Sequence, residues 1–416
     1  MATLSPTIHI LDKANYSKHR LVTRKNEPPT PLAPSSIRLR PRMLGLTTNN
    51  LTYARLGHLM GWYDVYPLPR NIPEPYNDGE AFGRIAAWGY AEITESTVPE
   101  ISSGQTVFGY LPVSTGVEDV CVSFAEHEGE QIQDHIIIKN KHRQHLLKIY
   151  NRYQVCASLS ELEKVKSVDS LGWDALMQVL FGTSYNLNMY GFAWEEGNRI
   201  HPSAQGEWST ADADLRGATI VILNASGKTG MSFAYSLRHH RPKEHQPKTI
   251  IGVASPASVS QILQSGLYNK AVLNSDFEST SADIDQSDAR RTLLFDFGAR
   301  KDANVLWKSC LCSNSVPFTL ITVGGEVMIQ DPEAIASRSA NIGALNIVNA
   351  SLLREKGIEV GGEKYFEEFS TAFDEFKGKV KGLRLQWGEG MEEWEQGWEA
   401  FCRDEVRADT GLVYRL

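Results

Sequence analysis

The sequence predicts an α/β protein with a doubly wound parallel sheet and a separate β-rich part. Residues 218–223 form an almost entirely apolar run that stops abruptly at small and glycine residues, and a helical pattern follows. This order is typical of a buried parallel strand, a tight turn and a helix. Strand and helix patterns then alternate as far as residue 323, which favours right-handed parallel crossovers.

Four more strands are expected after the first one. We place them at 248–254, 270–274, 292–297 and 317–323. The connection between the second and third strands has apolar residues at steps of three and four, namely Val259, Ile262, Leu263 and Leu267. A helix with this spacing can lay one apolar face on the sheet.

The turn after the first strand is suited to a phosphate group, because a helix N-terminus presents unpaired N–H groups and a positive dipole end. Gly227-Lys228-Thr229 copies the end of the phosphate loop of ATPases, but Ile222 occupies the place of that motif's first glycine. The relaxed dinucleotide fingerprint fits better, with Asn224 in place of its first glycine. The predicted cofactor residues of this Rossmann-type turn are Ala225, Ser226, Gly227, Lys228, Thr229 and Gly230. A plain structural turn is the alternative.

The end of the second strand indicates which dinucleotide would bind. An acid there would accept hydrogen bonds from the adenosine ribose, but the strand ends Val253-Ala254-Ser255-Pro256, so NADPH fits better than NADH. No Arg or Lys follows Ser255 within ten residues, although a 2′-phosphate normally needs one. Lys228 and Lys270 could supply that charge. We expect Ser255 near the adenosine phosphate and Val323, Gly324 and Gly325 near the nicotinamide end.

Composition narrows the function classes. The chain has 416 residues, enough for two domains, and its 42% hydrophobic content is normal for a soluble globular protein. A net charge of −8 argues against nucleic-acid and anionic-membrane binding. Five scattered cysteines indicate no disulfide framework, and the first thirty residues lack the apolar stretch of a secretory signal. We therefore expect a cytoplasmic protein that acts on a small-molecule substrate; the sequence leaves open whether it forms a homodimer.

The flanking parts differ from the parallel-sheet region. Between Ile37 and Phe124, short strand patterns are broken by prolines and glycines, which suggests an irregular β-barrel. The basic stretch 139–152 is interpreted as a solvated amphipathic helix. Near the C-terminus, aromatic residues step by three and four along two expected helices, around 365–376 and 391–401, and are interpreted as core.

Three segments resemble the medium-chain dehydrogenase/reductase superfamily. Residues 45–54 are similar to its early Asn-x-x-Asp segment, with Tyr53 where the acid usually stands. Residues 104–109 resemble its G-D-R-V-F-G turn. Residues 171–176 lie where its helix enters the cofactor domain. The resemblance implies a GroES-like β-rich catalytic domain at 1–165 and 335–416. It also implies a Rossmann domain at 166–334 inserted into it.

The run 48–54, followed by Gly61-Trp62-Tyr63, resembles a zinc-free, quinone-reductase-like branch catalogued only as a domain of unknown function. Members in filamentous fungi often occur among enzymes of specialised metabolism. The zinc ligands of other branches are missing, because the Gly-His-Glu position is occupied by 80–85 and the close pair Cys310 and Cys312 falls in the Rossmann region. His142 and His145 lack a third ligand. We predict no metal.

Without zinc, a reductase needs a side chain to hold the substrate oxygen and supply a proton. Tyr53 is our candidate for this catalytic role, with Asn50 as a neutral hydrogen-bond donor. The expected lining of an apolar substrate pocket comprises Trp62, Tyr63 and Tyr110. Alternatively, Tyr53 is a packed residue whose hydroxyl caps the backbone.

The sequence therefore predicts a zinc-independent, NADP(H)-dependent reductase of a carbonyl or an activated double bond in a small organic, specialised-metabolite substrate. A non-redox enzyme on the same fold, such as a cyclase, isomerase or C–C lyase, is the first alternative. Asn224 and the missing Arg after Ser255 motivate it. A catalytically silent binding protein is the second alternative.

Overall fold

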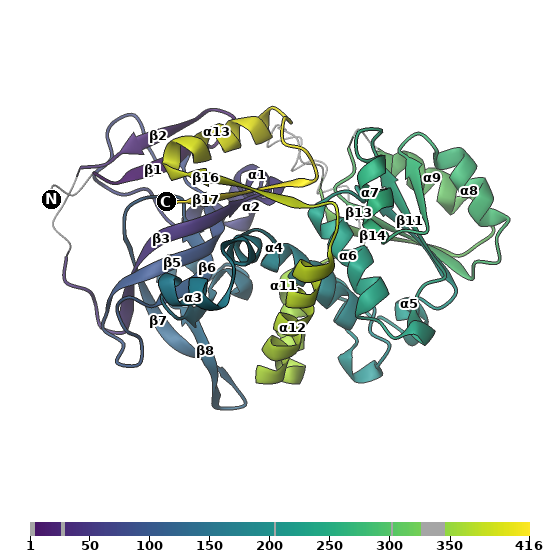
Figure 1. Ribbon diagram of the computed structural model, residues 1–416, viewed down its shortest axis with the longest axis horizontal. Helices are drawn as coiled ribbons and strands as arrows, with labels where there is room; N and C mark the ends of the chain where they lie inside the picture. Colours follow the sequence, from purple (N-terminus) through teal and green to yellow (C-terminus); the bar gives the residue numbers. More distant parts are fainter. Residues whose placement is uncertain (1–4, 26–29, 204, 301–302, 326–345) are drawn as a thin grey trace. The chain divides into compact units, whose positions relative to one another are not determined.

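The computed structural model describes residues 5–25, 30–203, 205–300, 303–325 and 346–416. These residues form two compact units (Figure 1). The first comprises the described residues up to Leu176 together with Leu385–Leu416, and the second comprises the described residues from Met177 to Arg384. The C-terminal segment that we assigned to the β-rich domain is thus shared between both units. The predicted boundary at 334–335 lies outside the described residues.

A closed antiparallel β-barrel forms the centre of the first unit. Its strands are, in spatial order, β3 (Ser36–Leu46), β5 (Ala86–Ser96), β6 (Thr106–Pro112), β9 (Arg152–Cys156), β8 (Glu130–Ile138) and β7 (Glu118–His127). Pairing of β7 with β3 closes the barrel. β17 (Thr410–Arg415) and β16 (Arg384–Glu389) extend the sheet beyond β3. The barrel that the sequence predicted is therefore confirmed.

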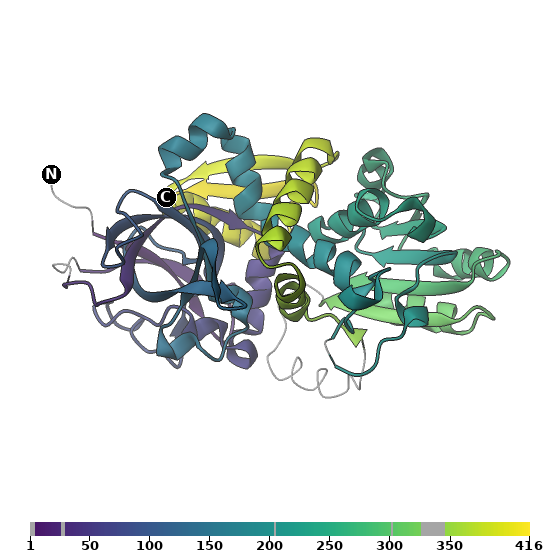
Figure 2. The same ribbon diagram turned by 90° about the horizontal axis from the view of Figure 1, so that it is seen from below.

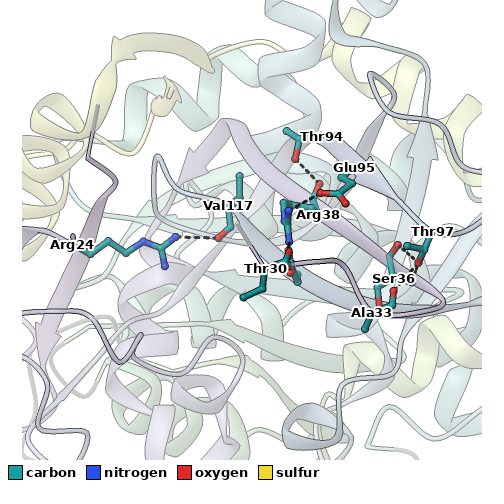
Figure 3. Close-up of polar contacts among 10 residues, drawn as sticks. Arg24, Thr30, Ala33, Ser36, Arg38, Thr94, Glu95, Thr97 and Val117 are labelled. Carbon is teal, nitrogen blue, oxygen red and sulfur yellow. Dashed lines mark hydrogen bonds and ion pairs between the residues drawn. The ribbon is translucent and has the colours of Figure 1, made fainter. Parts of the chain in front are cut away.

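Arg38 joins the strands at the seam where the barrel closes (Figure 3). It lies opposite Glu95 of β5 and opposite Asp119 of β7 in the strand register. Its guanidinium donates to both carboxylates at 2.6 Å and to the carbonyl of Thr30 at 2.6 Å. Such charge-assisted, forked hydrogen bonds fix register as well as adding stability.

Shorter elements complete the first unit. β1 (Thr7–Asp12), β2 (His19–Thr23) and β4 (Phe82–Gly83) form a small sheet. The helices are α1 (Thr48–Arg55), α2 (Gly57–Met60), η1 (Trp62–Asp64), η2 (Lys141–Arg143), η3 (Lys148–Tyr150), α3 (Leu159–Val165) and α13 (Gly390–Cys402). α13 buries Met391, Trp394 and Trp398, which confirms that its aromatic stripe is core. α4 (Val168–Asn186) runs from the first unit into the second.

The second unit is built on a six-stranded parallel sheet, coloured teal to light green in Figures 1 and 2. Its strands, in spatial order, are β12 (Lys270–Leu273), β11 (Thr249–Ala254), β10 (Ala218–Leu223), β13 (Arg291–Phe297), β14 (Phe318–Gly324) and β15 (Asn346–Ile347). In chain order this is 3-2-1-4-5-6, the arrangement of a Rossmann-type sheet. The predicted fold class is confirmed, and β15 is a sixth strand that we did not predict.

The second unit also contains helices. They are η4 (Leu187–Gly191), η5 (Glu196–Asn198), α5 (Thr210–Ala213), α6 (Lys228–His239), η6 (Lys243–His245), α7 (Val259–Ser265), α8 (Phe277–Asp285), α9 (Ala303–Cys312), α11 (Ala350–Gly361) and α12 (Glu363–Lys379). One core cluster joins Val221 and Val253 of the sheet to Trp307 of α9. α12 buries Tyr365, Phe373 and Phe376, as expected of its aromatic stripe. Among the described helices, none is long and apolar enough to cross a membrane.

Candidate functional site

The predicted cofactor turn connects β10 to α6. Asn224 has a φ of +56°, a left-handed conformation that asparagine tolerates better than most residues, and its side chain donates to the carbonyl of Phe297 at 3.1 Å. Asn224 thus takes up a backbone conformation for which glycine is normally selected. A Cβ on the buried Gly230 would lie 3.0 Å from the carbonyl oxygen of Asn224, so a glycine lets α6 approach the strand closely.

The start of α6 presents backbone donors. Its N-cap is Gly227, and among the described residues no side chain caps this end of the helix. Two hydrogen bonds fix the turn. The backbone N–H of Ala225 donates to the carbonyl of Val253 at 3.1 Å, and the carbonyl of Ala225 accepts from the hydroxyl of Tyr268 at 2.7 Å. A fixed turn with uncapped N–H groups is suited to a phosphate.

The parallel sheet brings all predicted cofactor residues to one edge. Leu223 pairs with Val253 and with Asp296, so β10, β11 and β13 end at the same level. Ser255 follows β11 directly, and Val323 and Gly324 end β14. In parallel sheets, ligands bind outside this carboxyl edge.

Asp296, at the end of β13, is a residue of this edge that the sequence analysis missed. Its side chain accepts from the backbone N–H groups of Gly298 and Ala299 and from Asn304 at 2.7–3.0 Å. Gly298 has a φ of +95°, and a Cβ there would lie 2.7 Å from the carbonyl of Gly325. Asp296 therefore shapes the turn next to Val323-Gly324-Gly325. An acid directly after a buried apolar run was the available signal.

The two lysines that we considered for a 2′-phosphate differ in position. Lys228 begins α6, at the carboxyl edge. Lys270 begins β12, at the opposite edge, and forms an ion pair with Asp283 at 2.7 Å. The suggestion that Lys270 supplies this charge was therefore wrong. At the end of β11, Ser255 donates to the hydroxyl of Ser258 at 3.2 Å.

Tyr53 lies on α1, inside an aromatic cluster of the first unit. The cluster consists of Tyr53, Trp62, Trp88, Tyr110 and Tyr150, and its ring contacts span 4.8–6.1 Å between centroids. The Tyr53 hydroxyl accepts from Nδ2 of Asn49 at 2.7 Å and from Nε1 of Trp88 at 3.0 Å. Burial raises the pKa of Tyr53 to about 12, while the hydrogen bond from Trp88 opposes this rise. The hydroxyl is therefore neutral at physiological pH.

The side chain of Asn50 caps the start of α1. Its carboxamide oxygen accepts from the backbone N–H of Thr47 at 2.9 Å, and its Nδ2 donates to the carbonyl of Ala86 at 3.3 Å. With the Thr47 side chain this forms a capping box. The amide that reaches the Tyr53 hydroxyl belongs to Asn49, which we missed. Its helical i, i+4 spacing to Tyr53 was the available signal.

The predicted pocket residues fall into two groups. Trp62 and Tyr110 join Tyr53 in the aromatic cluster. Tyr63 instead donates to the carbonyl of Ala54 at 2.8 Å and packs beside His58, with Lys13 over its ring. Trp88 and Tyr150, which complete the cluster, carried no sequence signal that we recognised. All five cluster side chains are buried.

The basic stretch 139–152 is not a solvated helix. Its helical turns are the short segments η2 and η3, its last residue begins β9, and Arg143 is completely buried. Arg143 donates to the side chain of Asn151 at 2.8 Å, and its guanidinium lies over the rings of Tyr66 and Tyr153. The helical interpretation was wrong, because ring and carbonyl contacts fix the stretch instead of helical hydrogen bonds.

The described part of the chain contains no cluster of side chains that could serve as metal ligands. There, no three His, Cys, Asp or Glu side chains could hold a metal ion together. His145 contacts Asp64 at 3.3 Å (Nε2 to Oδ2). A zinc-independent site stays a prediction.

A protein-family comparison identifies the chain. The family model described as "Protein of unknown function (DUF2855)" matches residues 44–407. The chain belongs to this family. The resemblance to a branch of unknown function is thereby confirmed. No curated protein matches the sequence significantly.

Solved structures with low sequence identity share the fold of this DUF2855 protein. A mutant form of enoyl thioester reductase from Candida tropicalis is 10% identical, with 100% of each chain covered and a TM-score of 0.54. The CurF ER cyclopropanase of the curacin A pathway is 12% identical, with 99% of each chain covered and a TM-score of 0.54. CurA from Vibrio vulnificus, in complex with NADPH, is 12% identical, with 98% of each chain covered and a TM-score of 0.51. The chain thus shares its fold, over nearly its whole length, with these solved structures.

Proposed function

We propose that this DUF2855 protein is a zinc-independent, NADPH-dependent reductase that acts on an activated double bond, or on a carbonyl, of a small organic substrate. The observation that carries the proposal is the carboxyl edge of the parallel sheet. There, a glycine turn precedes an uncapped helix N-terminus, and no acid follows the second strand. This combination suits a dinucleotide with a 2′-phosphate.

The residues at this edge fit such a cofactor. We propose that Ala225 through Gly230 hold the pyrophosphate with their backbone N–H groups, and that Ser255 and Lys228 contribute to the 2′-phosphate site. Val323, Gly324 and Gly325 would border the nicotinamide. Bound NADPH would supply a hydride.

In the first unit, we propose that Tyr53 supplies the proton or holds the substrate oxygen. Asn49 and Trp88 both donate to its oxygen, so these bonds would stabilise the phenolate left after proton transfer. The hydroxyl keeps its own proton to donate. We further propose that Asn50 positions Tyr53 by capping α1, and that Trp62, Tyr63 and Tyr110 shape the substrate pocket.

The structural relatives support a reductase and favour the activated double bond. They include an enoyl thioester reductase, a protein from the curacin A pathway and a complex with NADPH. The second of these supports a substrate from specialised metabolism.

Cofactor titration tests the proposal. We expect isothermal titration calorimetry to show that NADPH binds more tightly than NADH. Gly227→Val should abolish binding, because the branched side chain would fill the space of the pyrophosphate. The matched control is Gly197→Val, since the same unit leaves open space around that glycine.

The folding of Gly227→Val must be checked by circular dichroism. A Cβ at Gly227 would lie 2.9 Å from Nδ2 of Asn224, so the turn must shift slightly to accept the valine. Absence of heat and of a thermal shift with both nucleotides on wild-type protein would contradict the reductase proposal. It would favour a non-redox enzyme, which Asn224 and the lack of a basic residue after Ser255 already motivate.

A further inference from the structure

Buried polar side chains fix the backbone of Tyr110 in the wall of the barrel. It lies on β6 directly opposite Trp88 of β5. Its carbonyl lies within hydrogen-bond distance of the hydroxyls of Tyr66 and Tyr153, two buried residues whose hydroxyl oxygens lie 2.9 Å from each other. The guanidinium of Arg143 lies over both of these rings. The backbone of Tyr110 is therefore fixed by a network of buried polar groups.

The hydroxyl of Tyr110 contrasts with this anchored backbone. The residue is completely buried, and within the described residues its hydroxyl has no hydrogen-bond partner. Tyr53, whose ring lies 5.0 Å away, has its hydroxyl bonded to Asn49 and Trp88. Burying a hydroxyl without a partner is unfavourable, and a phenylalanine would pack the same space without that cost.

An unpartnered hydroxyl on a fixed backbone is a preorganised hydrogen-bond donor. Burial raises the pKa of Tyr110 well above its usual range, so the hydroxyl carries its proton at neutral pH. Two donors that converge on one oxygen stabilise negative charge developing there. The hydroxyls of Tyr53 and Tyr110 belong to neighbouring rings of the aromatic cluster, and of these two only that of Tyr110 has no partner within the described residues.

We propose that the Tyr110 hydroxyl is a second donor to the substrate oxygen, beside Tyr53. This inference rests on the proposed function, in which the substrate oxygen becomes an enolate or alkoxide. Tyr110 donates a hydrogen bond and keeps its proton, whereas Tyr53 is the residue that can transfer one. Tyr110 is thereby a catalytic residue and not only part of the pocket lining.

The test uses an anion that mimics an enolate and needs no cofactor. The affinity of wild-type protein and of Tyr110→Phe for 4-nitrophenolate is measured by the absorbance of the phenolate. We expect the variant to bind about tenfold to a hundredfold more weakly, the scale of one hydrogen bond to a charged group. Its resistance to chemical denaturation should be unchanged or higher, because no protein partner loses a bond.

Two further variants separate this role from a structural one. Tyr53→Phe should lose affinity for the phenolate and also lose stability, since Asn49 and Trp88 lose their acceptor. Tyr365→Phe removes a buried hydroxyl that donates to Asn186 at 3.0 Å in the second unit, so it should lose stability and keep its affinity for the phenolate.

Equal phenolate affinity in wild type and Tyr110→Phe, or absence of binding to the wild type, would overturn the proposal. A crystal structure with an ordered water on the Tyr110 hydroxyl, together with equal affinities, would assign that hydroxyl to a water only. The NADPH titration and the phenolate titration answer different questions. Failure to bind NADPH contradicts the proposed function, while the phenolate result decides whether Tyr110 is a donor.

Discussion

At the scale of single residues, the polar groups around Tyr53 decide what it can do. Asn50 was the expected donor, but its amide is used by the backbone of Thr47 and Ala86. Asn49 reaches the hydroxyl instead, one residue earlier on the same helix. The motif indicated the right helix, and only the helical phase of α1 distinguishes the two asparagines.

Replacement of Tyr53 by phenylalanine should affect both catalysis and stability. We expect turnover to fall roughly a hundredfold or more, the scale of general acid catalysis, with little change in NADPH affinity. Stability should fall by about 1–3 kcal/mol, because Trp88 Nε1 and Asn49 Nδ2 lose their buried acceptor. Steady-state kinetics and chemical denaturation measure the two effects. Near-normal turnover would show that Tyr53 is structural.

At the scale of elements, local patterns predicted strands better than they predicted loops. The apolar run 218–223 coincides with β10, because a parallel strand buried on both faces needs apolar residues at every position. The stretch 139–152 could not be predicted in this way. Its conformation depends on Arg143 reaching Tyr66 and Tyr153, and Tyr66 is distant in sequence.

The residues at the carboxyl edge of the parallel sheet were also predictable from local strand patterns. The predicted residues there end a strand or come after one, so parallel pairing alone brings 224–230, 255 and 323–325 to the same edge. The aromatic cluster could be predicted only in part. Tyr53, Trp62 and Tyr110 came from motif positions, whereas Trp88 enters the cluster through its cross-strand position opposite Tyr110, and that register is a tertiary property.

Closure of the barrel by β3 can be tested with two arginines on that strand. Arg38→Met should destabilise the protein by about 2 kcal/mol, because a largely buried guanidinium loses hydrogen bonds to two carboxylates on two different strands. The control is Arg42→Met, whose partly exposed side chain bonds only Glu92, at 2.9 Å, in the part of the chain described; we expect about 0.5 kcal/mol. Urea denaturation measures both. Equal losses would show that the seam depends on backbone pairing alone.

At the scale of the whole molecule, the first unit is joined by segments from both ends of the chain. The hairpin of β1 and β2 lies against α13 in Figure 1, and it precedes the residues that the family model matches. Trp398 donates to the carbonyl of Tyr16 at 3.0 Å, and the backbone of Leu21 donates to Glu395 at 3.1 Å. Sequence patterns identified the apolar face of α13, but its partner segment is more than 350 residues away.

A buried histidine pair makes this junction sensitive to acid. His9 accepts from Trp394 at Nδ1 (3.3 Å), so its proton lies on Nε2, which donates to His19 at 3.2 Å. Burial, followed by the neighbouring His19, holds the pKa of His9 well below its usual range. Burial also lowers the pKa of His19, although Glu395 and Glu399 of α13 oppose this shift.

The sign of the pH effect follows from these shifts. In the unfolded chain, histidine protonates near its ordinary pKa of about 6.5, so below that pH the unfolded state binds more protons than the folded state. Stability should therefore be complete above that pH and should fall as the pH drops towards the lower, folded pKa. We expect urea denaturation to show a lower unfolding free energy at pH 5 than at pH 7.5. His9→Asn should reduce the difference, because the amide can still accept from Trp394 but cannot titrate. An identical acid dependence in the variant would show that other titrating groups, and not His9, cause the loss.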